Sequence, residues 1–345
     1  MASRVVVTGS TGMLGSNLAQ FLVRNGYDVL GIDLRPPSTQ DLSDYRIADV
    51  RDTALLTGLL AGADAVVHCA SALPSYPAEA IHDVIVGGTR SVLTAGRRAG
   101  VGRIVHISST AVYGLPSLVP TPEDHPREPV DVYGRAKTEA EEVAEKFRAD
   151  GMCLTIVRPK TFLGPGRMGL FAMLFEWAEE GHNFPVLGSG DVRIQMLAIE
   201  DLIAAVATIL AAPDDQANDT YNIAAAEFGT LRADFQAVLD LAGHGKRVVS
   251  LPKRPALAAL QVLERTRLSP VYGRLLHKLL ADSYVSIDKA RDRLGFWPNM
   301  SNVDAILRTY TWWRESQVAA SPRGTGNTSR DAWRQGALSL AKILF

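Results

Sequence analysis

The 345-residue chain has little of several features that mark specialised protein classes. Its only two cysteines, Cys69 and Cys153, exclude a disulfide-rich secreted scaffold. Each lies in an apolar run, so we expect buried free thiols in a cytosolic, reducing compartment. The formal net charge of -1 provides no global field that would attract nucleic acid or an anionic membrane, so neither is expected as a partner.

Long hydrophobic runs and metal-ligand clusters are also missing. No apolar run reaches transmembrane length, and the N-terminus enters a strand pattern without the layout of a signal peptide, so we expect no stable membrane insertion. No Cys/His cluster has the spacing of metal ligands, so no metal site is expected. The remaining composition, 47% hydrophobic and 21% charged, is typical of a globular enzyme with one large or two modest domains.

Short β-branched runs alternate with helical patterns through the first half of the chain. The strand-like runs are RVVVTG, DVLGID, DAVVHCA, RIVHIS and CLTIVRP. Strands separated by helices at this spacing predict βαβ units and a parallel sheet with both faces covered. The fold class is therefore expected to be α/β, with a Rossmann-type doubly wound sheet.

Glycines follow the first strand at a spacing that suits phosphate binding. Gly9, Gly12 and Gly15 lie between this strand and a helix, where they allow a tight turn and a close approach to a pyrophosphate. The helix N-terminus, with Met13 and Leu14, adds N–H donors and a positive dipole. This context predicts a dinucleotide site rather than a purely structural turn.

The end of the second strand indicates which dinucleotide is bound. Asp33 would accept hydrogen bonds from the adenosine ribose and repel a 2′-phosphate, which favours NAD over NADP. Leu34 and Arg35 would flank this contact, although an arginine here can instead accommodate a 2′-phosphate. Asp49 and Val50, after a third strand, suit an edge of the adenine, and Asp49 also suits the N-cap of a helix.

A tyrosine and a lysine share one face of a later helix. Tyr133 and Lys137 are four residues apart, which places them side by side. A phenol keeps its proton at neutral pH, but a neighbouring ammonium favours the phenolate. Tyr133 could then take or return a hydroxyl proton while a dinucleotide moves hydride. The alternative is a surface helix in which the two residues have no chemical role.

Together these motifs resemble the extended short-chain dehydrogenase/reductase superfamily, and within it the NAD-dependent sugar-nucleotide epimerases and dehydratases. The resemblance covers about residues 3–315 and includes the segments VVHCASA, SSTAVYG, YGRAK and RPKTFLGPG in this order. It implies NAD as cofactor, a UDP-sugar as substrate and a smaller, mostly helical substrate lobe. It also implies a homodimer formed through two helices, one of them carrying Tyr133.

The pattern along the chain predicts how it divides into domains. Residues 1–160 plus 191–225 would form the NAD-binding domain, and residues 161–190 plus 226–315 the substrate lobe. Residues 316–345 would form a linker and a helical tail. We expect the tail to pack on the body or on a second subunit rather than on a membrane surface.

The resemblance also implies roles for individual residues. Tyr133 would be the catalytic acid/base, Lys137 would hold the ribose and tune Tyr133, and Ser109 would assist at the sugar hydroxyl. Cys69, Ala70 and Ser71 would line the nicotinamide side, and Tyr133, Lys137 and Pro159 would also contact the cofactor.

Two departures from the family pattern affect cofactor and diphosphate contacts. Ile85 occupies a position where the family often has Asn near the nicotinamide ribose, and it cannot make that hydrogen bond. HKLLADSYVS replaces an Arg-x-Gly-Asp stretch that often precedes the last strand. His277 or Lys278 would replace the missing diphosphate contact, or each is a surface residue.

The residue pair Thr110-Ala111 narrows the reaction. Family members that dehydrate the sugar usually carry an Asp-Glu pair here, and the UDP-xylose-forming decarboxylases carry a Glu. With Ala111, neither reaction is expected, which leaves reversible oxidation of one carbinol. Epimerisation at C4 fits: hydride leaves C4, the keto-sugar rotates, and hydride returns to the other face.

The sugar is indicated less directly. Thr161 stands where glucose/galactose epimerases usually carry Asn and UDP-glucuronate 4-epimerases carry Thr. With Arg167 it suits a sugar carboxylate, or it is a Thr at a buried strand end. Arg193 suits the UDP phosphates, or it is a solvated loop arginine. Ser283 stands where some epimerases carry a bulky Tyr that excludes N-acetyl sugars, so the resemblance implies room for a larger group at C2. The predicted substrate contacts are Ser109, Thr110, Tyr133, Thr161, Arg167, Leu170 and Arg193.

Three functional hypotheses follow. The first is an NAD-retaining UDP-sugar 4-epimerase acting on UDP-glucuronate/UDP-galacturonate or UDP-glucose/UDP-galactose. The second is a net dehydrogenase of the same superfamily, such as a hydroxysteroid-type enzyme. The third is an NAD-sensing regulatory or scaffold protein, against which the intact set of Ser109, Tyr133 and Lys137 argues.

Overall fold

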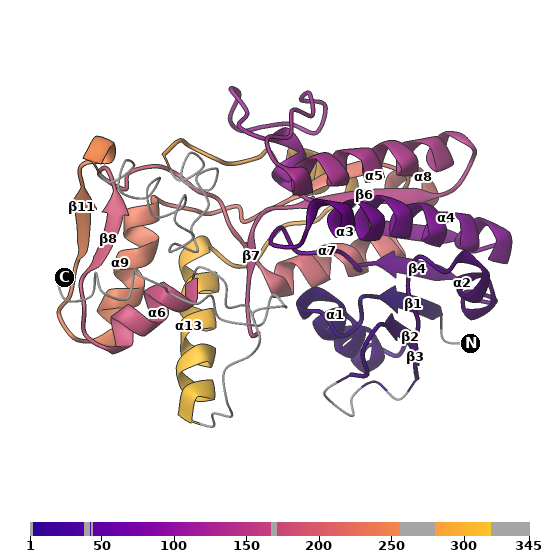
Figure 1. The fold of residues 1–345 in the computed structure, drawn as a ribbon, viewed down its shortest axis with the longest axis horizontal. Helices are drawn as coiled ribbons and strands as arrows, with labels where there is room; N and C mark the ends of the chain where they lie inside the picture. The colour runs from indigo at the N-terminus through magenta and orange to yellow at the C-terminus, as the bar shows by residue number, and fades with distance from the viewer. Residues whose placement is uncertain (1–2, 38–41, 43, 167–170, 256–279, 319–345) are drawn as a thin grey trace.

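The computed structural model describes residues 3–37, 42, 44–166, 171–255 and 280–318 (Figure 1). The predicted tail from residue 319 onward lies outside the described residues. Four residues with predicted roles also lie outside them: Arg167, Leu170, His277 and Lys278.

A seven-stranded parallel sheet forms the centre of the larger part of the molecule, in the order β10-β6-β5-β4-β1-β2-β3. Its strands are β1 (Arg4–Thr8), β2 (Asp28–Asp33), β3 (Tyr45–Ile47), β4 (Ala65–His68), β5 (Arg103–Ile107), β6 (Leu154–Pro159) and β10 (Thr220–Ile223). The order reverses between β1 and β4, which is the arrangement of a doubly wound sheet. The predicted fold class is therefore confirmed.

Helices cover both faces of this sheet because alternate residues of each strand point to opposite sides. Val5 and Val7 join the core under one pair of helices, whereas Val6 joins the core under the other set. The first face carries α1 (Met13–Arg24) and α7 (Ile199–Ala211). The second face carries α2 (Thr53–Leu59), α4 (Gly88–Ala99) and α5 (Val132–Ala149), with α3 (Ala78–His82) and the π-helix η1 (Asp83–Gly87) leading into α4.

A smaller lobe lies at the side of the molecule away from the N-terminus (Figure 1). It contains α6 (Phe171–Glu179), α9 (Leu231–Ala242), α13 (Asn302–Val318) and the parallel pair β8 (Phe184–Leu187) and β11 (Val248–Leu251). Its core is rich in aromatic rings, among them Phe175, Trp177, Tyr310 and Trp313. The ring centroids of Phe175 and Tyr310 lie 5.4 Å apart, so α6 and α13 pack directly on each other.

The remaining described elements are short. These are the 3-10 helix η2 (Thr110–Tyr113), the pair β7 (Phe162–Leu163) and β9 (Leu197–Ala198), α8 (Asp214–Ala217) and α12 (Asp288–Leu294). Although α12 falls within the range predicted for the lobe, its Ala290 belongs to the core of the main sheet, and α13 continues to Val318. The division of the chain into two domains stays a prediction.

Both cysteines are free and half-buried rather than fully buried. Cys69 follows β4, and burial raises the pKa of its thiol to about 12. Cys153 lies beside the exposed Asp214, with 3.6 Å between Sγ and Oδ1.

Among the described residues, no cluster of three or more His, Cys, Asp or Glu side chains could hold a metal ion. None of the described helices combines the length and apolarity needed to cross a membrane.

Candidate active site at the carboxyl ends of the strands

The glycine-rich turn after β1 is packed so closely that Gly9 and Gly15 have no room for a side chain. Gly9 has a φ of 69°, and a Cβ there would lie 2.7 Å from the backbone nitrogen of Ala70. A Cβ at Gly15 would lie 2.1 Å from the Gly9 carbonyl oxygen. Gly12 caps α1 without a side-chain hydrogen bond, so the first N–H groups of the helix remain able to bind an anion. The turn fits the pyrophosphate of a dinucleotide and lies directly against the predicted nicotinamide loop.

Asp33 at the end of β2 is fixed beside this turn. Its Oδ2 accepts a hydrogen bond from the Thr11 N–H at 3.0 Å, and its Oδ1 accepts one from the Arg35 N–H at 3.3 Å. Leu34 is 62% exposed, and the Arg35 side chain is exposed as well. The carboxylate is held where a ribose could donate to it, and the neighbouring residues leave the approach open.

The segment after β3 differs in one respect from the prediction. Asp52, not Asp49, caps α2, since its carboxylate accepts a hydrogen bond from Leu55 N–H at 3.0 Å. Asp49 instead pairs with Arg51, with 2.6 Å between Oδ2 and Nη2, and the pKa of Asp49 is lowered by the hydrogen bond from Arg51. The alternative of an Asp49 cap is therefore wrong, and its contact with adenine, like that of Val50, stays a prediction.

The beginning of α5 is pressed against the turn that contains Ser109. Asp131 caps the helix, and its Oδ1 accepts a hydrogen bond from Gly134 N–H at 2.7 Å. A Cβ at Gly134 would lie only 2.8 Å from the carbonyl oxygen of Ala111, so only glycine permits this approach. The packing brings η2 to the helical turn that carries Tyr133.

Lys137 is held beneath Tyr133 in a buried position. Its Nζ donates a hydrogen bond to the Ile107 carbonyl oxygen at 2.8 Å and lies 5.9 Å from the centre of the Tyr133 ring. Burial lowers the pKa of Lys137 to about 8, although the nearby Glu141 and Cys69 favour its charged form. One of the three N–H groups is used by Ile107, and the others can serve a ribose hydroxyl.

Ser109 and Thr110 are placed by the turn after β5. The Ser109 Oγ accepts a hydrogen bond from Ala111 N–H at 3.1 Å, which leaves its own proton available for donation to a substrate oxygen. Thr110 Oγ1 donates to the Pro159 carbonyl oxygen at 3.4 Å. The predicted catalytic turn therefore contacts Pro159, a predicted cofactor-binding residue at the end of β6.

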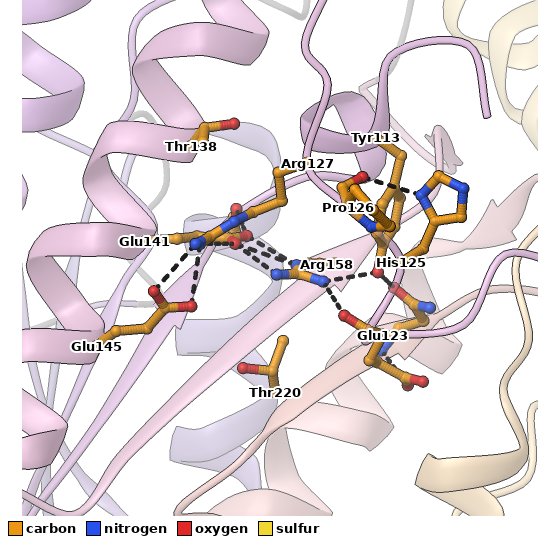
Figure 2. Close-up of polar contacts among 12 residues, drawn as sticks. Tyr113, Glu123, His125, Pro126, Arg127, Thr138, Glu141, Glu145, Arg158 and Thr220 are labelled. Atoms are coloured by element: carbon orange, nitrogen blue, oxygen red, sulfur yellow. Dashed lines mark hydrogen bonds and ion pairs between the residues drawn. The ribbon is translucent and has the colours of Figure 1, made fainter.

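The sequence analysis missed a buried ionic network behind these residues. The Arg158 guanidinium on β6 lies between the Glu141 carboxylate on α5 and the Tyr113 hydroxyl (Figure 2). Ser108 Oγ donates to Glu141 Oε1 at 2.5 Å. Burial opposes the charge on Arg158, but the hydrogen bond and charge of Glu141 outweigh it and raise its pKa. The sequence does contain one indication of this network, which is the arginine inside the apolar strand LTIVRP. A buried arginine requires a partner.

Buried polar residues at the ends of β4 and β5 were also missed. His68 Nδ1 is 2.7 Å from Thr8 Oγ1, its Nε2 is 3.3 Å from Thr89 Oγ1, and burial lowers its pKa to about 3. Its ring centroid is 5.6 Å from that of His106. Ile85 is 1% exposed inside η1, and its apolar side chain contributes packing but has no group that can hydrogen-bond. This part of the site therefore holds neutral imidazoles and apolar packing.

The predicted substrate contacts that the structure describes lie on four different segments, which carry Ser109 and Thr110, Tyr133, Thr161, and Arg193. Arg193 is exposed, and its guanidinium lies 4.7 Å from the Phe228 ring centre and 5.1 Å from that of Tyr284. It is thus oriented by two rings rather than fully solvated. Thr161 is exposed between β6 and β7, so the alternative of a buried strand end is wrong. Ser71 is exposed after β4.

Comparisons with known proteins show what this chain is similar to. A model of the NAD dependent epimerase/dehydratase family matches residues 5–224. The uncharacterized protein y4nG of Sinorhizobium fredii is 33% identical over 97% of this chain and 84% of its own length. A 3 beta-hydroxysteroid dehydrogenase/Delta 5-->4-isomerase of Mycobacterium tuberculosis is 30% identical and covers 88% of each chain. The UDP-glucose 4-epimerase of Thermotoga maritima, solved with UDP-glucose, superposes with a TM-score of 0.75 at 21% identity, over 91% of this chain and 99% of its own.

Proposed function

Because this chain belongs to the NAD-dependent epimerase/dehydratase family, we propose that it is a UDP-sugar 4-epimerase that uses NAD. The substrate would be UDP-glucuronate/UDP-galacturonate or UDP-glucose/UDP-galactose. The observation that carries the proposal is the packing of the turn with Ser109 and Ala111 against the start of α5, where Lys137 Nζ lies 5.9 Å from the centre of the Tyr133 ring. A turn without a carboxylate at Ala111 supports redox chemistry at one carbon rather than dehydration.

The cofactor site would be formed by the first three βα segments and the residues after β4 and β6. The glycine turn would bind the pyrophosphate, and Asp33 the adenosine ribose. When bound, NAD supplies the acceptor and donor of hydride at C4. The proposed contacts are Gly9, Gly12, Met13, Leu14, Gly15, Asp33, Leu34, Arg35, Asp49, Val50, Cys69, Ala70, Ser71, Tyr133, Lys137 and Pro159.

The chain's own residues would move and hold the proton. The Tyr133 phenolate removes the proton from the C4 hydroxyl while Ser109 donates a hydrogen bond to the same oxygen. The Lys137 ammonium stabilises the phenolate by its charge. After the keto-sugar has rotated, Tyr133 returns the proton to the oxygen at C4. Arg193, oriented by Phe228 and Tyr284, would hold the diphosphate during this rotation.

A second candidate is a net NAD-dependent dehydrogenase of a secondary alcohol. The Mycobacterium tuberculosis relative, which is named as a hydroxysteroid dehydrogenase and is 30% identical, favours it. The same Tyr133, Lys137 and Ser109 would serve this reaction, since it needs the same proton transfer and a single hydride step.

One assay separates the two functions. Purified protein is incubated with UDP-glucuronate and, separately, with UDP-glucose, without added NAD, and the products are analysed for C4 epimers. We expect conversion, because epimerisation regenerates NAD. If neither sugar nucleotide is converted with or without added NAD, the 4-epimerase proposal fails. Steady NADH production from an alcohol would establish the second candidate.

The proposal includes a homodimer formed through two helices, one of them α5, and a cytoplasmic location. Sedimentation of the purified full chain should give twice the monomer mass of 37.2 kDa. A monomeric mass at micromolar concentration would contradict the dimer without affecting the proposed reaction.

A further inference from the structure

The turn that carries Ser109 is bound at its start to a buried carboxylate. Ser108, which directly precedes Ser109, is 3% exposed, and its N–H donates to the Val157 carbonyl oxygen on β6 at 2.7 Å. Its Oγ donates to Oε1 of Glu141, a residue of α5 whose side chain is fully buried. At this one residue the backbone of the turn is fixed to β6 and the side chain to α5.

The same turn is bound at its end to the counter-ion of this carboxylate. Tyr113 is the last residue of η2 and is 2% exposed. Its hydroxyl accepts a hydrogen bond from Arg158 Nη1 at 2.7 Å and donates one to Asn222 Oδ1 at 2.8 Å. Arg158 Nη2 in turn donates to Glu141 Oε2 at 2.7 Å (Figure 2). The two halves of one ion pair therefore hold the two ends of the segment from Ser108 to Tyr113.

The hydroxyl that would assist the reaction lies between these two ends. Ser109 Oγ accepts a hydrogen bond from Ala111 N–H, and the Ala111 carbonyl oxygen lies against Gly134 at the start of α5. Tyr133 directly precedes Gly134, and Glu141 lies two turns further along the same helix. The turn and the helix are therefore joined at two points, and the separation of Ser109 from Tyr133 depends on both.

Proton transfer is sensitive to this separation. A hydroxyl assists only when its oxygen lies within hydrogen-bond reach of the reacting atom, about 2.6–3.2 Å. A misplacement of about 1 Å can lower the rate roughly 100-fold. A short 3-10 turn has poor hydrogen-bond geometry of its own, so contacts from outside the turn are needed to keep one conformation. Hydrogen bonds to a buried carboxylate and a buried guanidinium can supply them, because these bonds are strong and water does not compete with them.

We propose that Ser108 and Tyr113 are positioning residues, through which the Glu141 and Arg158 pair holds the Ser109 hydroxyl in place for proton transfer by Tyr133. Both side chains are buried, so neither is available to contact a substrate. The inference rests on the proposed function and adds to it the contacts that align two of its reacting side chains. It applies to the 4-epimerase and to the second candidate alike, because both need the same proton transfer.

Hydrogen exchange tests these contacts without turnover. Full-length wild type, Ser108→Ala, Tyr113→Phe and Tyr221→Phe are compared by mass spectrometry of peptides that cover residues 108–114. Tyr221 is the control because it is equally buried and its hydroxyl donates to a backbone carbonyl oxygen, on β10 at the edge of the sheet. We expect the N–H groups that donate within the turn to exchange roughly 5- to 10-fold faster in Ser108→Ala and Tyr113→Phe, and at the wild-type rate in the control.

Steady-state kinetics with UDP-glucuronate and UDP-glucose test the link to Ser109. Ser108→Ala is measured alone and in combination with Ser109→Ala, in NAD-loaded protein. We expect Ser108→Ala alone to lower kcat roughly 10- to 100-fold, with KM within about twofold of wild type. In the Ser109→Ala background the same substitution should change kcat by less than about twofold, because its effect acts through a hydroxyl that is already missing. Tyr221→Phe should leave kcat within about twofold of wild type.

Each result decides one of the two proposals. Unchanged exchange in both Ser108→Ala and Tyr113→Phe overturns the positioning role, and so does an equal loss of kcat with and without the Ser109 hydroxyl. Faster exchange with an unchanged kcat also overturns it, since the turn would then be held without consequence for the reaction. If wild type converts neither sugar nucleotide, the 4-epimerase fails and the exchange measurement alone decides the positioning role. If Ser108→Ala fails to fold, Tyr113→Phe repeats both measurements from the other end of the turn.

Discussion

The Arg158 guanidinium and the Glu141 carboxylate form a buried ion pair, with 2.7 Å between Nη2 and Oε2. Glu141 lies on α5, one turn after Lys137, and Arg158 immediately precedes Pro159 on β6. The pair therefore joins the helix that carries the proposed acid/base to the strand that faces the proposed nicotinamide position. Arg127 and Glu145 extend this network (Figure 2), and the Glu145 side chain is 40% exposed.

Replacing Glu141 with Gln should strongly destabilise the protein. Gln keeps the shape but leaves the Arg158 charge buried without its counter-ion, so the free energy of unfolding should fall by about 3–5 kcal/mol. Urea denaturation measures this change. Glu142→Gln is the control, because Glu142 is exposed on the same helix and its loss should stay within about 0.5 kcal/mol. Equal effects of the two substitutions would refute the structural role of the pair.

Replacing Gly15 with Ala should abolish NAD binding or prevent folding. The new Cβ would overlap the Gly9 carbonyl oxygen, which is backbone and cannot swing away. Calorimetric titration with NAD, together with thermal unfolding, distinguishes the two outcomes. Gly58→Ala in α2 is the control, since nothing lies within 4 Å of its Cβ and alanine favours a helix by about 1 kcal/mol. Normal NAD affinity in Gly15→Ala would disprove the close approach.

Replacing Tyr133 with Phe should reduce turnover roughly 100- to 10,000-fold, because the ring remains and only the proton-transferring hydroxyl is lost. NAD affinity and the melting temperature should change little. Tyr45→Phe provides the comparison, since Tyr45 is exposed on β3, at the edge of the sheet. Full turnover in Tyr133→Phe would rule out its assignment as acid/base for the epimerase and the dehydrogenase alike.

The buried Lys137 should cause activity to fall in alkaline solution. Its pKa is lowered from 10.5 to about 8, so the ammonium that supports Tyr133 is progressively lost above pH 8. Between pH 8 and 10.5 the unfolded chain binds this proton more tightly than the folded protein, so the contribution of Lys137 to stability increases with pH. Profiles of kcat/KM and of unfolding free energy should therefore move in opposite directions over this range. Activity that persists unchanged to pH 10 would contradict this prediction.

Local sequence patterns predicted the parallel sheet and the cofactor turn because their causes are local. Alternation along a strand decides which face each residue covers, and the short loop after a strand determines whether glycine is required. The Tyr133 and Lys137 pair follows in the same way from helical periodicity. The sequence did not decide which aspartate caps α2, because either Asp49 or Asp52 could accept hydrogen bonds from the first N–H groups of this helix.

Contacts between distant segments needed the folded chain. Nothing in the segment RPKTFLGPG shows that Lys160 would meet Ser283, 123 residues later, because that bond depends on how the 193–195 segment pairs with residue 283. The same holds for Arg158 and Glu141, whose burial is compensated only when β6 and α5 pack together. The sequence by itself determined the sheet, the glycine turn and the helical pair, since these depend on covalent geometry and short-range periodicity. The tertiary structure alone decided which buried charges meet, because desolvation makes each of them depend on a partner from another element.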